Sequence, residues 1–431
     1  MVARDVPAAL SPTSNLACAA DRAGIAVNAL DTELRAPLRQ RGFCPSLRTP
    51  MESGDGLLVR LPAGSRGFTA GELRALCRLA DAHGNGLIEV TRRANLQLRG
   101  LREDSLPALR RELVELGLAS GPESSATLLV NPLAGLASDC ESLEPLARAI
   151  DAALVASGAL VELSDKFGVV VDCCGELREI AADIRVERKL ARAELRVDGD
   201  DAALGSCASS DAPRAVAALA SVLAANGQRR MRQLMQAGGR AELLRAARLD
   251  AEVSPPSAAT PRQLGFQRGA RDWLGLALAF GSGTSQQWRA LADLAERFGS
   301  GELRTTPFRG VILPDVGEQA EVRELAAAAG WISAPSEPLL RVSACPGAPA
   351  CSSAAGDTRD LARALAPLLA ADARMHVSGC EKGCAHSGAA DVTLVRVAGG
   401  VKLGFGLSAA QTADQPDTNL ETARVRVQAH S

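Results

Sequence analysis

The sequence predicts an α+β protein in which one structural plan occurs twice. Residues 73–91 and 288–306 align without a gap at an offset of 215 residues, with eight of nineteen positions identical. Each copy has the pattern of a strand, an amphipathic helix, a Gly-x-Gly turn and a second strand. A longer segment with mixed helix and strand patterns follows each copy, beginning at residues 128 and 341. The predicted order along the chain is therefore A-B-A′-B′.

The turn strengthens the evidence for duplication, because alanine-rich helices can resemble one another without common origin. Both copies share the Gly-x-Gly turn and a threonine at the same offset, Thr91 and Thr306. The stretch S-P-P-S-A-A-T-P at residues 254–261 is a natural linker between the two copies. The predicted divisions are an N-terminal arm at 1–40, the first A half at 41–122, the first α/β domain at 123–253, the linker at 254–262, the second A half at 263–336, the second α/β domain at 337–410 and a C-terminal tail at 411–431.

The composition is that of a soluble globular protein. Hydrophobic residues make up 47% of the 431 residues and charged residues 23%, and the length exceeds what one compact core can hold. A net charge of -2 without a long basic run argues against a nucleic-acid partner. No apolar run is long enough to span a membrane, and the N-terminus lacks the layout of a secretory signal. We therefore expect the protein in the cytoplasm, with no membrane partner.

Four cysteines near the C-terminus form a pattern. Cys345 and Cys351 frame C-P-G-A-P-A-C, and Cys380 and Cys384 frame C-E-K-G-C. Zinc sites usually pair cysteines two residues apart, so these spacings fit zinc poorly. Glycine and proline let the backbone bend closely around inorganic sulfide, which favours an iron–sulfur cluster. Four unconnected thiols are the alternative.

The remaining cysteines are expected to be structural thiols. An odd total of eleven in a chain without a secretory signal argues against a disulfide framework. Cys77 lies in an amphipathic run and is predicted to fill core space. The adjacent Cys173 and Cys174 follow V-V-V-D, where a strand turns, and are predicted to be buried thiols and not a redox pair. With Cys140, they are expected to be dispensable for the cluster.

The doubled plan and the cysteine set together resemble the sulfite and nitrite reductases. Weaker matches are T-R-R-A-N-L-Q-L-R-G at 91–100, L-S-D-K-F-G at 163–168 and T-P-F-R-G at 306–310. The resemblance covers roughly residues 40–408 and implies two ferredoxin-like halves and two α/β halves in a pseudo-twofold arrangement. In that family the cysteines bind a [4Fe–4S] cluster, and the last one bridges to the iron of sirohaem. The implied metal ligands are Cys345, Cys351, Cys380 and Cys384.

The chain departs from the reductases where they clamp a small anion. Ala126 stands in the position of one of their arginines. Their motif L-P-R-K-F-K reads L-S-D-K-F-G here, so Lys166 is kept, Asp165 adds a negative charge and Gly168 replaces the second lysine. Sulfite and nitrite need concentrated positive charge. These changes argue against six-electron reduction of a small oxyanion.

A branch of the same superfamily keeps the scaffold and uses a tetrapyrrole as substrate. Residues 41–61, R-G-F-C-P-S-L-R-T-P-M-E-S-G-D-G-L-L-V-R-L, resemble that branch, the precorrin-3B synthases. The resemblance implies an oxidoreductase that hydroxylates precorrin-3A at C20 with dioxygen, followed by lactone formation by an acetate side chain. It also implies a [4Fe–4S] cluster, a second, mononuclear non-haem iron centre that activates dioxygen, and an external, NADH-linked electron donor.

Several cationic and polar residues in the matched motifs are predicted to bind the substrate, whose edge carries acetate and propionate groups. Arginine pairs well with carboxylates, and alternate residues of a strand share one face. Each of these residues has a plainer alternative as a solvated surface group. His376 and His386 lie near the cysteines in sequence, which alone assigns them no role, and no catalytic residue is assigned. The predicted substrate-binding residues are Arg93, Gln97, Arg99, Lys166 and Arg309.

Two other functions remain open on the sequence alone. A sirohaem-dependent sulfite or nitrite reductase with an altered anion clamp would show a sirohaem absorption band. A non-enzymatic iron–sulfur protein for electron transfer or sensing, or a scaffold whose cysteines bind zinc, would be separated by metal and sulfide analysis.

Overall fold

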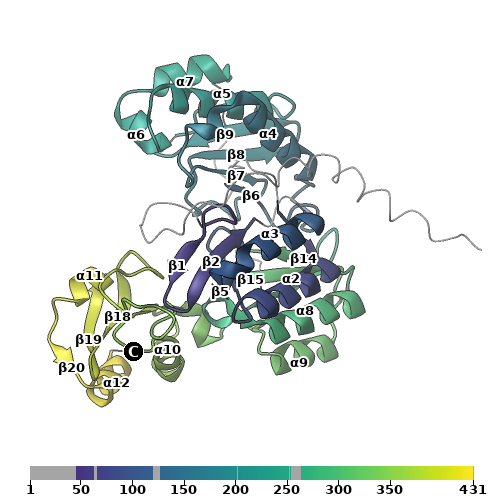
Figure 1. Cartoon of the computed structure of the whole chain (residues 1–431). Coiled ribbons are helices and arrows are strands. Elements are labelled where there is room, and N and C mark those ends of the chain that lie inside the picture. Colours follow the sequence, from purple (N-terminus) through teal and green to yellow (C-terminus); the bar gives the residue numbers. More distant parts are fainter. Residues whose placement is uncertain are drawn as a thin grey trace, which may run out of the picture.

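The computed structural model describes residues 45–62, 66–119, 127–200, 202–251, 253 and 264–430. The predicted N-terminal arm (1–40) and the predicted linker (254–262) lie outside the described residues. Figure 1 shows a central domain with one α/β domain above it and the other at its lower left. The central domain is built from residues on both sides of the first α/β domain. Residues of the central domain form hydrogen bonds with the first and with the second α/β domain.

Two five-stranded antiparallel sheets form the central domain. The first has the order β1-β2-β5-β4-β13, with strands Met51–Ser53 (β1), Gly56–Leu61 (β2), Leu96–Leu101 (β5), Leu87–Val90 (β4) and Ser282–Thr284 (β13). The second has the order β11-β12-β15-β14-β3, with strands Gly265–Gln267 (β11), Trp273–Ala277 (β12), Gly310–Pro314 (β15), Glu302–Thr305 (β14) and Phe68–Thr69 (β3).

The two halves of the central domain exchange a short edge strand. β3 directly precedes the helix Ala70–His83 (α2) but pairs with β14 of the second sheet. β13 stands in the same position in the second copy and pairs with β4 of the first sheet. Residues of both halves contribute to one hydrophobic core, including Leu76 and Leu291. The two halves are therefore copies of one another in the sequence, but they fold together as a single domain.

The predicted repeat at an offset of 215 residues is confirmed by the helices. α2 (Ala70–His83) and α8 (Ser285–Phe298) each begin with a capping box, at Thr69 and Thr284, and each ends at a glycine, Gly84 and Gly299. A capping box satisfies backbone donors that the first helical turn leaves unpaired. The two helices pack against each other beside the sheets (Figure 1). The further helices of the domain are α3 (Leu106–Glu115) and α9 (Ala320–Ala328).

The first α/β domain has one mixed sheet of five strands. β6, β7 and β8 are parallel, and β9 and β10 return antiparallel. Four helices accompany the sheet, and they share its hydrophobic core. The elements are Thr127–Val130 (β6), Gly168–Asp172 (β7), Ile184–Lys189 (β8), Arg192–Val197 (β9), Gly205–Ala208 (β10), Glu144–Ser157 (α4), Ala212–Ala225 (α5), Met231–Gln236 (α6) and Arg240–Ala247 (α7).

The second α/β domain repeats this topology. Its sheet has the order β16-β17-β18-β19-β20, in which the first three strands are parallel and the last two antiparallel. The predicted tail contains β20 and α12, and Ala423 and Val427 of α12 are buried in the domain's core. The elements are Val342–Ala344 (β16), Met375–Ser378 (β17), Ala390–Val397 (β18), Gly400–Leu407 (β19), Asp417–Thr418 (β20), Arg359–Leu365 (α10), Ala409–Thr412 (α11) and Leu420–Ala429 (α12).

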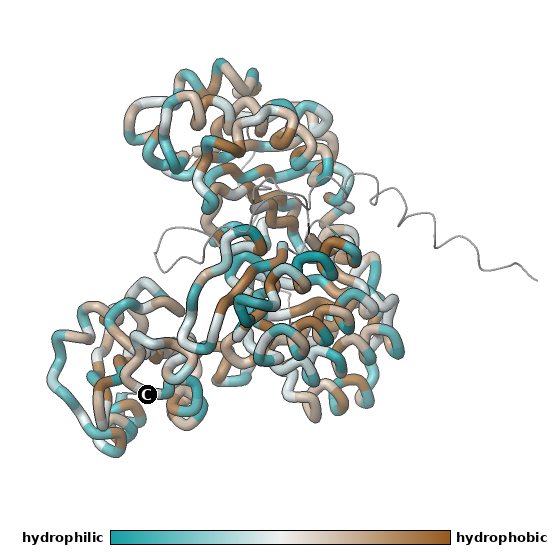
Figure 2. Tube along the Cα trace, in the orientation of Figure 1, coloured by the Kyte–Doolittle hydropathy of each residue, from teal (hydrophilic) through white to brown (hydrophobic). Residues whose placement is uncertain are grey.

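Five short 3-10 helices complete the described elements: Glu103–Ser105, Ala159–Val161, Ala279–Gly281, Pro338–Arg341 and Ala366–Leu368. Figure 2 shows hydrophobic residues along the inner strands and hydrophilic residues at many outer turns. In the described part of the chain, every helix is too short or too polar to cross a bilayer.

Candidate active site

Two loops of the second α/β domain bring the four predicted metal ligands to one end of its sheet. Cys345 directly follows β16, and Cys380 comes two residues after β17. The loops are joined by a hydrogen bond from the Ala355 N–H to the Gly379 carbonyl, 3.0 Å, and by one from Lys382 Nζ to Ser353 Oγ, 2.8 Å. None of these four cysteines forms a disulfide. Parallel strands end here with their carboxyl ends side by side, as at the ligand sites of other open α/β sheets.

Gly379 packs closely against Cys345 and the loop that follows it. The Gly379 N–H donates a hydrogen bond to Cys345 Sγ at 3.2 Å, and such bonds tune cluster sulfurs. A Cβ on Gly379 would lie 2.5 Å from the Ala354 side chain and 3.5 Å from Cys345 Sγ, so only glycine leaves this space open. Binding of a [4Fe–4S] cluster by these four cysteines stays a prediction.

The loop between Cys345 and Cys351 also contacts the central domain. The Gly54 N–H and the Ser53 hydroxyl, at the β1–β2 turn, donate hydrogen bonds to the Ala350 carbonyl at 3.1 and 3.0 Å. A Cβ on Gly54 would lie 2.7 Å from the Pro349 carbonyl oxygen. The turn and the cysteine loop therefore fit closely only with glycine at this position.

Arg99, a predicted substrate contact, belongs to a buried polar network on β5. Its side chain is 4% exposed and bonds Asp55 at 2.8 and 3.0 Å, Glu89 at 3.5 Å and the Ala350 carbonyl at 3.3 Å. Gln97, on the same face as predicted, donates to Glu89 at 2.7 Å. The network thus supports the cysteine loop. Substrate contact by Arg99 or Gln97 stays a prediction.

Glu89 is the centre of this network and also joins the two domains. Arg359 of α10 reaches across to it, with Nη2 and Oε1 2.6 Å apart. Burial raises the pKa of Glu89, but the guanidinium groups of Arg359 and Arg99 outweigh it, so the pKa lies below its usual value. The carboxylate is therefore charged and neutralised by two arginines from different domains.

Arg309 lies at the boundary between the central domain and the cysteine-bearing domain. Its backbone has φ 64°, the same left-handed turn conformation that Ala94 adopts 215 residues earlier. The guanidinium donates to the Val342 carbonyl at 2.9 Å and to Ser343 Oγ at 2.7 Å. Burial lowers the pKa of Arg309 to about 10, and the neighbouring cations Arg92 and Arg359 add to the effect. The three arginines form a cationic group beside β16.

A buried histidine lies next to this cationic group. His376, on β17, is fully buried, and neither ring nitrogen has a hydrogen-bond partner among the described residues. Its ring lies edge-on to His386, with the ring centres 5.7 Å apart. Burial lowers the pKa of His376 to about 4, with smaller effects of His386, Arg309 and Arg92. The imidazole is therefore neutral at neutral pH.

Arg93 points to a different part of the molecule from Arg92, its neighbour on the β4–β5 turn. It lines a cavity of about 70 Å³ between the central domain and the first α/β domain. Arg66 and Arg304 line the same cavity, and Arg304 donates to the Ala134 carbonyl at 2.6 Å. The β4–β5 turn thus presents one arginine to each α/β domain.

Lys166 is half-buried just before β7 and is absent from the described lining of this cavity. Its contact with substrate stays a prediction. Asp165 beside it is exposed, and Gly168 begins β7 in the buried sheet. Ala126, the third departure from the reductase motifs, lies outside the described residues.

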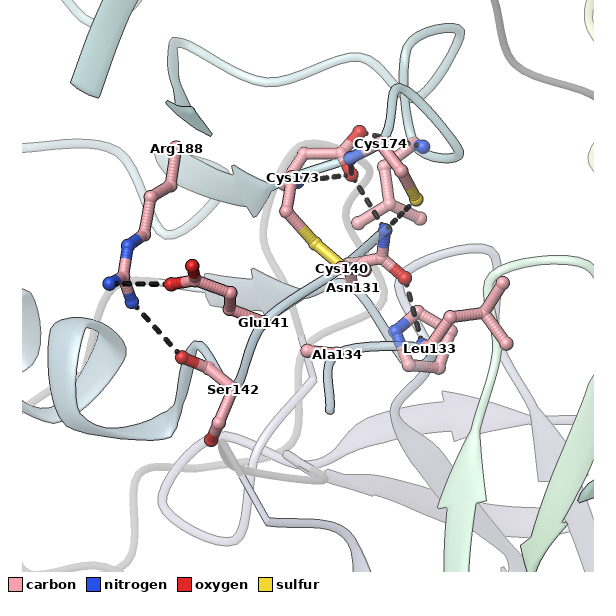
Figure 3. The surroundings of a disulfide bond; sticks show 12 residues. Asn131, Leu133, Ala134, Cys140, Glu141, Ser142, Cys173, Cys174 and Arg188 are labelled. Carbon is pink, nitrogen blue, oxygen red and sulfur yellow. Dashed lines mark hydrogen bonds and ion pairs between the residues drawn. A yellow bond between two sulfur atoms is a disulfide. The ribbon is translucent and has the colours of Figure 1, made fainter. Parts of the chain in front are cut away.

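The first α/β domain contains a cysteine group that the sequence did not predict. Cys140 and Cys173 form a disulfide, so the expectation of free thiols is wrong for this pair (Figure 3). Cys77 and Cys174 are buried and form no disulfide, as expected. One signal in the sequence could have indicated this group. Cys173 and Cys174 follow β7, which has the same place in its sheet as β17, the strand before Cys380. Arg92 and Arg359 were missed because their neighbours come from distant parts of the chain.

Both halves of the central domain match one protein-family model. The model described as the nitrite/sulfite reductase ferredoxin-like half domain matches residues 49–116 and 267–329. A solved structure titled as the NirA protein of Mycobacterium tuberculosis superposes with a TM-score of 0.68 at 20% identity, covering 83% of this chain and 79% of that one. The chain therefore has the α+β fold with two nitrite/sulfite reductase ferredoxin-like halves, as predicted.

Two relatives indicate the branch of the superfamily to which the chain belongs. A precorrin-3B synthase from Sinorhizobium sp is 33% identical over 389 residues, which is 85% of this chain and 82% of the relative. A ferredoxin–nitrite reductase from Synechococcus elongatus is 28% identical over 394 residues, 78% of this chain and 75% of the relative. The chain belongs to the precorrin-3B synthase branch of the superfamily.

Proposed function

We propose that this protein hydroxylates precorrin-3A at C20 with dioxygen and that lactone formation by an acetate side chain then gives precorrin-3B. The observation that carries the proposal is the 33% identity to a precorrin-3B synthase across 85% of the chain. In the overall reaction one oxygen atom enters the substrate. The other leaves as water, with two electrons and two protons supplied through an external, NADH-linked donor.

Cys345, Cys351, Cys380 and Cys384 are the residues that would hold a [4Fe–4S] cluster. When bound, the cluster supplies electrons one at a time, which dioxygen chemistry needs. For the second iron, His376 is a candidate ligand, because it is a neutral imidazole whose ring nitrogens have no hydrogen-bond partner among the described residues. His376 also lies on β17, the strand that leads to Cys380.

The cations around the central domain favour a large, multiply charged substrate. Arg92 and Arg309 face the cysteine-bearing domain, whereas Arg93 faces the cavity beside the first α/β domain. A small dianion needs its positive charge in one place, because desolvating it otherwise costs several kcal/mol. A macrocycle edged with carboxylates can pair with arginines spread over a wider surface. The spread arrangement therefore suits the tetrapyrrole.

We expect the purified protein to convert precorrin-3A under ¹⁸O₂ and to incorporate one labelled oxygen atom at C20. With sulfite or nitrite and a strong artificial electron donor, we expect negligible turnover. The control is the same preparation under argon, which should leave precorrin-3A unchanged. Reduction of either anion at about 1 per second or faster, with a sirohaem band, would support the alternative reading as a reductase. That reading has its own support in the 28% identity to a ferredoxin–nitrite reductase.

Removing the charge of Arg93 or Arg309 should weaken tetrapyrrole binding without removing the cluster. A charge-assisted hydrogen bond contributes about 1.5–3 kcal/mol, so Arg93→Gln and Arg309→Gln should each raise the dissociation constant roughly tenfold or more. Binding can be followed by the change in tetrapyrrole absorption. Arg148→Gln, at a side chain 68% exposed on α4, is the control and should bind as the wild type does. Equal affinity in all variants would contradict the assignment.

A further inference from the structure

The cysteine triad of the first α/β domain consists of Cys140, Cys173 and Cys174. Their three sulfur atoms lie within 4.8 Å of one another. Cys140 and Cys173 are joined as a disulfide with Cα atoms 5.4 Å apart, and Cys174 lies buried beside them, outside the disulfide (Figure 3). The chain bends at residues 173 and 174, so two consecutive side chains can face the same point, which a regular strand forbids.

The triad lies at the position that the predicted cluster ligands occupy in the second α/β domain. The parallel pairs β6–β7 and β16–β17 end in equivalent registers, Val130 opposite Val171 and Ala344 opposite Val377. The next residue donates its N–H across the pair in each domain, from Asn131 to the Val171 carbonyl and from Cys345 to the Val377 carbonyl.

Counting on from this register aligns one cysteine of each domain. Cys174 comes three residues after Val171, and Cys380 comes three residues after Val377. Asn131 stands in the position of Cys345, and Cys140 lies later in the same loop. Both domains thus place thiols at the carboxyl ends of the same two parallel strands, where open α/β sheets bind ligands.

A buried hydrogen-bond network fixes the triad. The Asp172 carboxylate accepts from Asn131 Nδ2 at 2.7 Å, from the Cys173 N–H at 2.8 Å and from the Leu177 N–H at 2.9 Å. Asn131 Nδ2 also lies 3.2 Å from Cys174 Sγ, to which it donates. A donor aimed at a sulfur stabilises its thiolate form, and partners of this kind orient the ligands of metal ions.

We propose that the reduced triad binds one thiophilic divalent ion, Zn²⁺ or Fe²⁺, through the sulfurs of Cys140, Cys173 and Cys174. Metal–sulfur bonds of about 2.3 Å in a tetrahedral site place sulfurs roughly 3.8 Å apart, which is within the 4.8 Å that separates the three sulfurs at most. The sulfurs of Cys140 and Cys173 would separate to this distance once their bond is reduced. Binding displaces three thiol protons, and three protein ligands leave a fourth position for water or another ligand. The cavity of about 70 Å³, lined in part by Asn131 and Ser142, offers access from that side.

The disulfide and the ion compete for the sulfurs of Cys140 and Cys173. The site therefore forms only after the disulfide is reduced, a two-electron step. In the experiment a phosphine supplies these electrons and becomes the phosphine oxide, while water supplies the oxygen atom and the two thiol protons. This site does not depend on the reaction proposed above, because ion binding and product formation are measured separately.

The test uses the full-length protein, purified without oxygen, reduced with a phosphine and treated with a chelator. Zn²⁺ is then titrated in competition with a chromophoric chelator, and sulfide content shows that the cluster remains. The wild type and Cys207→Ser, which changes a buried free thiol of the same domain, should each bind one Zn²⁺ per chain at this site. Loss of an orienting residue already weakens metal binding about 10–100-fold. Cys174→Ser should therefore bind at least about a hundredfold more weakly.

Asn131→Ala keeps all three sulfurs, so it tests the proposed site even if Cys174→Ser does not fold. It should weaken Zn²⁺ binding about 10–100-fold while the sulfide content stays constant. Metal analysis of the protein after phosphine reduction and incubation with Zn²⁺ should show one more zinc ion per chain in the wild type than in Cys174→Ser, in addition to the cluster and any iron held elsewhere. Zn²⁺ binding that is equal in the wild type, Cys174→Ser and Asn131→Ala would overturn the proposal. Persistence of the Cys140–Cys173 bond after reduction, with no bound ion, would overturn it as well.

Discussion

Replacing Cys345 or Cys380 with serine should abolish the iron–sulfur cluster, whereas replacing Cys207 should leave it in place. The anaerobically purified wild type should contain about four iron and four sulfide per chain in the cluster, with any further iron held elsewhere. Each of the two thiolates would be a direct ligand, and Cys345 also accepts the Gly379 N–H. The measurements are iron, acid-labile sulfide and visible absorption. Cys207 is a matched control, since it is a buried free thiol on β10.

The same measurement tests which domain holds the cluster. Serine variants of Cys140, Cys173 and Cys174 should keep the wild-type sulfide content, even where they lose a separately bound ion. Loss of the visible absorption in the Cys173 or Cys174 variant would place the cluster in the first α/β domain. Stoichiometric zinc without sulfide in the wild type would rule the cluster out.

Arg99→Met should lower the free energy of unfolding of the central domain by about 3–5 kcal/mol. Arg99 is 4% exposed, and its loss leaves Asp55 without its 2.8 Å ion pair and Glu89 with only one arginine. The chain has three tryptophans, and all are buried. Trp288 and Trp331 lie in the core of the central domain, whereas Trp273, on β12, packs into the core of the first α/β domain. Tryptophan fluorescence during urea denaturation therefore reports mainly on the central domain.

Arg102→Met provides the comparison for that measurement. Arg102 follows β5 and is 56% exposed, and its contact with Asp104 spans 3.7 Å. Exposed pairs contribute about 0–1 kcal/mol, so this variant should unfold close to the wild type. If the two variants had equal stability, the buried network would not be a major source of stability in the domain.

The duplication was predictable because it leaves a periodic pattern in the sequence. Thr69 with Thr284 and Gly84 with Gly299 begin and end equivalent helices, and these signals are local. The exchange of β3 and β13 was not predictable, since two or three residues carry no periodicity. Their pairing depends on which edge is open in space. The family resemblance supplied what local patterns could not, including the relation between the two α/β domains.

The candidate site was predictable where its residues lie close together in the sequence. The four cysteines lie on two short loops, and the structure brings those loops together. The role of Arg99 was not predictable, because its partners Asp55 and Glu89 come from other strands. The triad escaped prediction because Asn131 replaces a cysteine at the register position of Cys345. The strand ends correspond only when the two sheets are compared residue by residue.

The strand exchange has a consequence for synthesis on the ribosome. β4 emerges early, but its outer neighbour β13 emerges only after residues 91–281 have been made. At 5–20 residues per second that interval lasts roughly ten to forty seconds. Throughout it, the nascent chain carries an unpaired sheet edge, a known starting point for aggregation. The first α/β domain can fold during this wait, so the nascent protein should depend on chaperone protection of the β4 edge until its last ferredoxin-like half is complete.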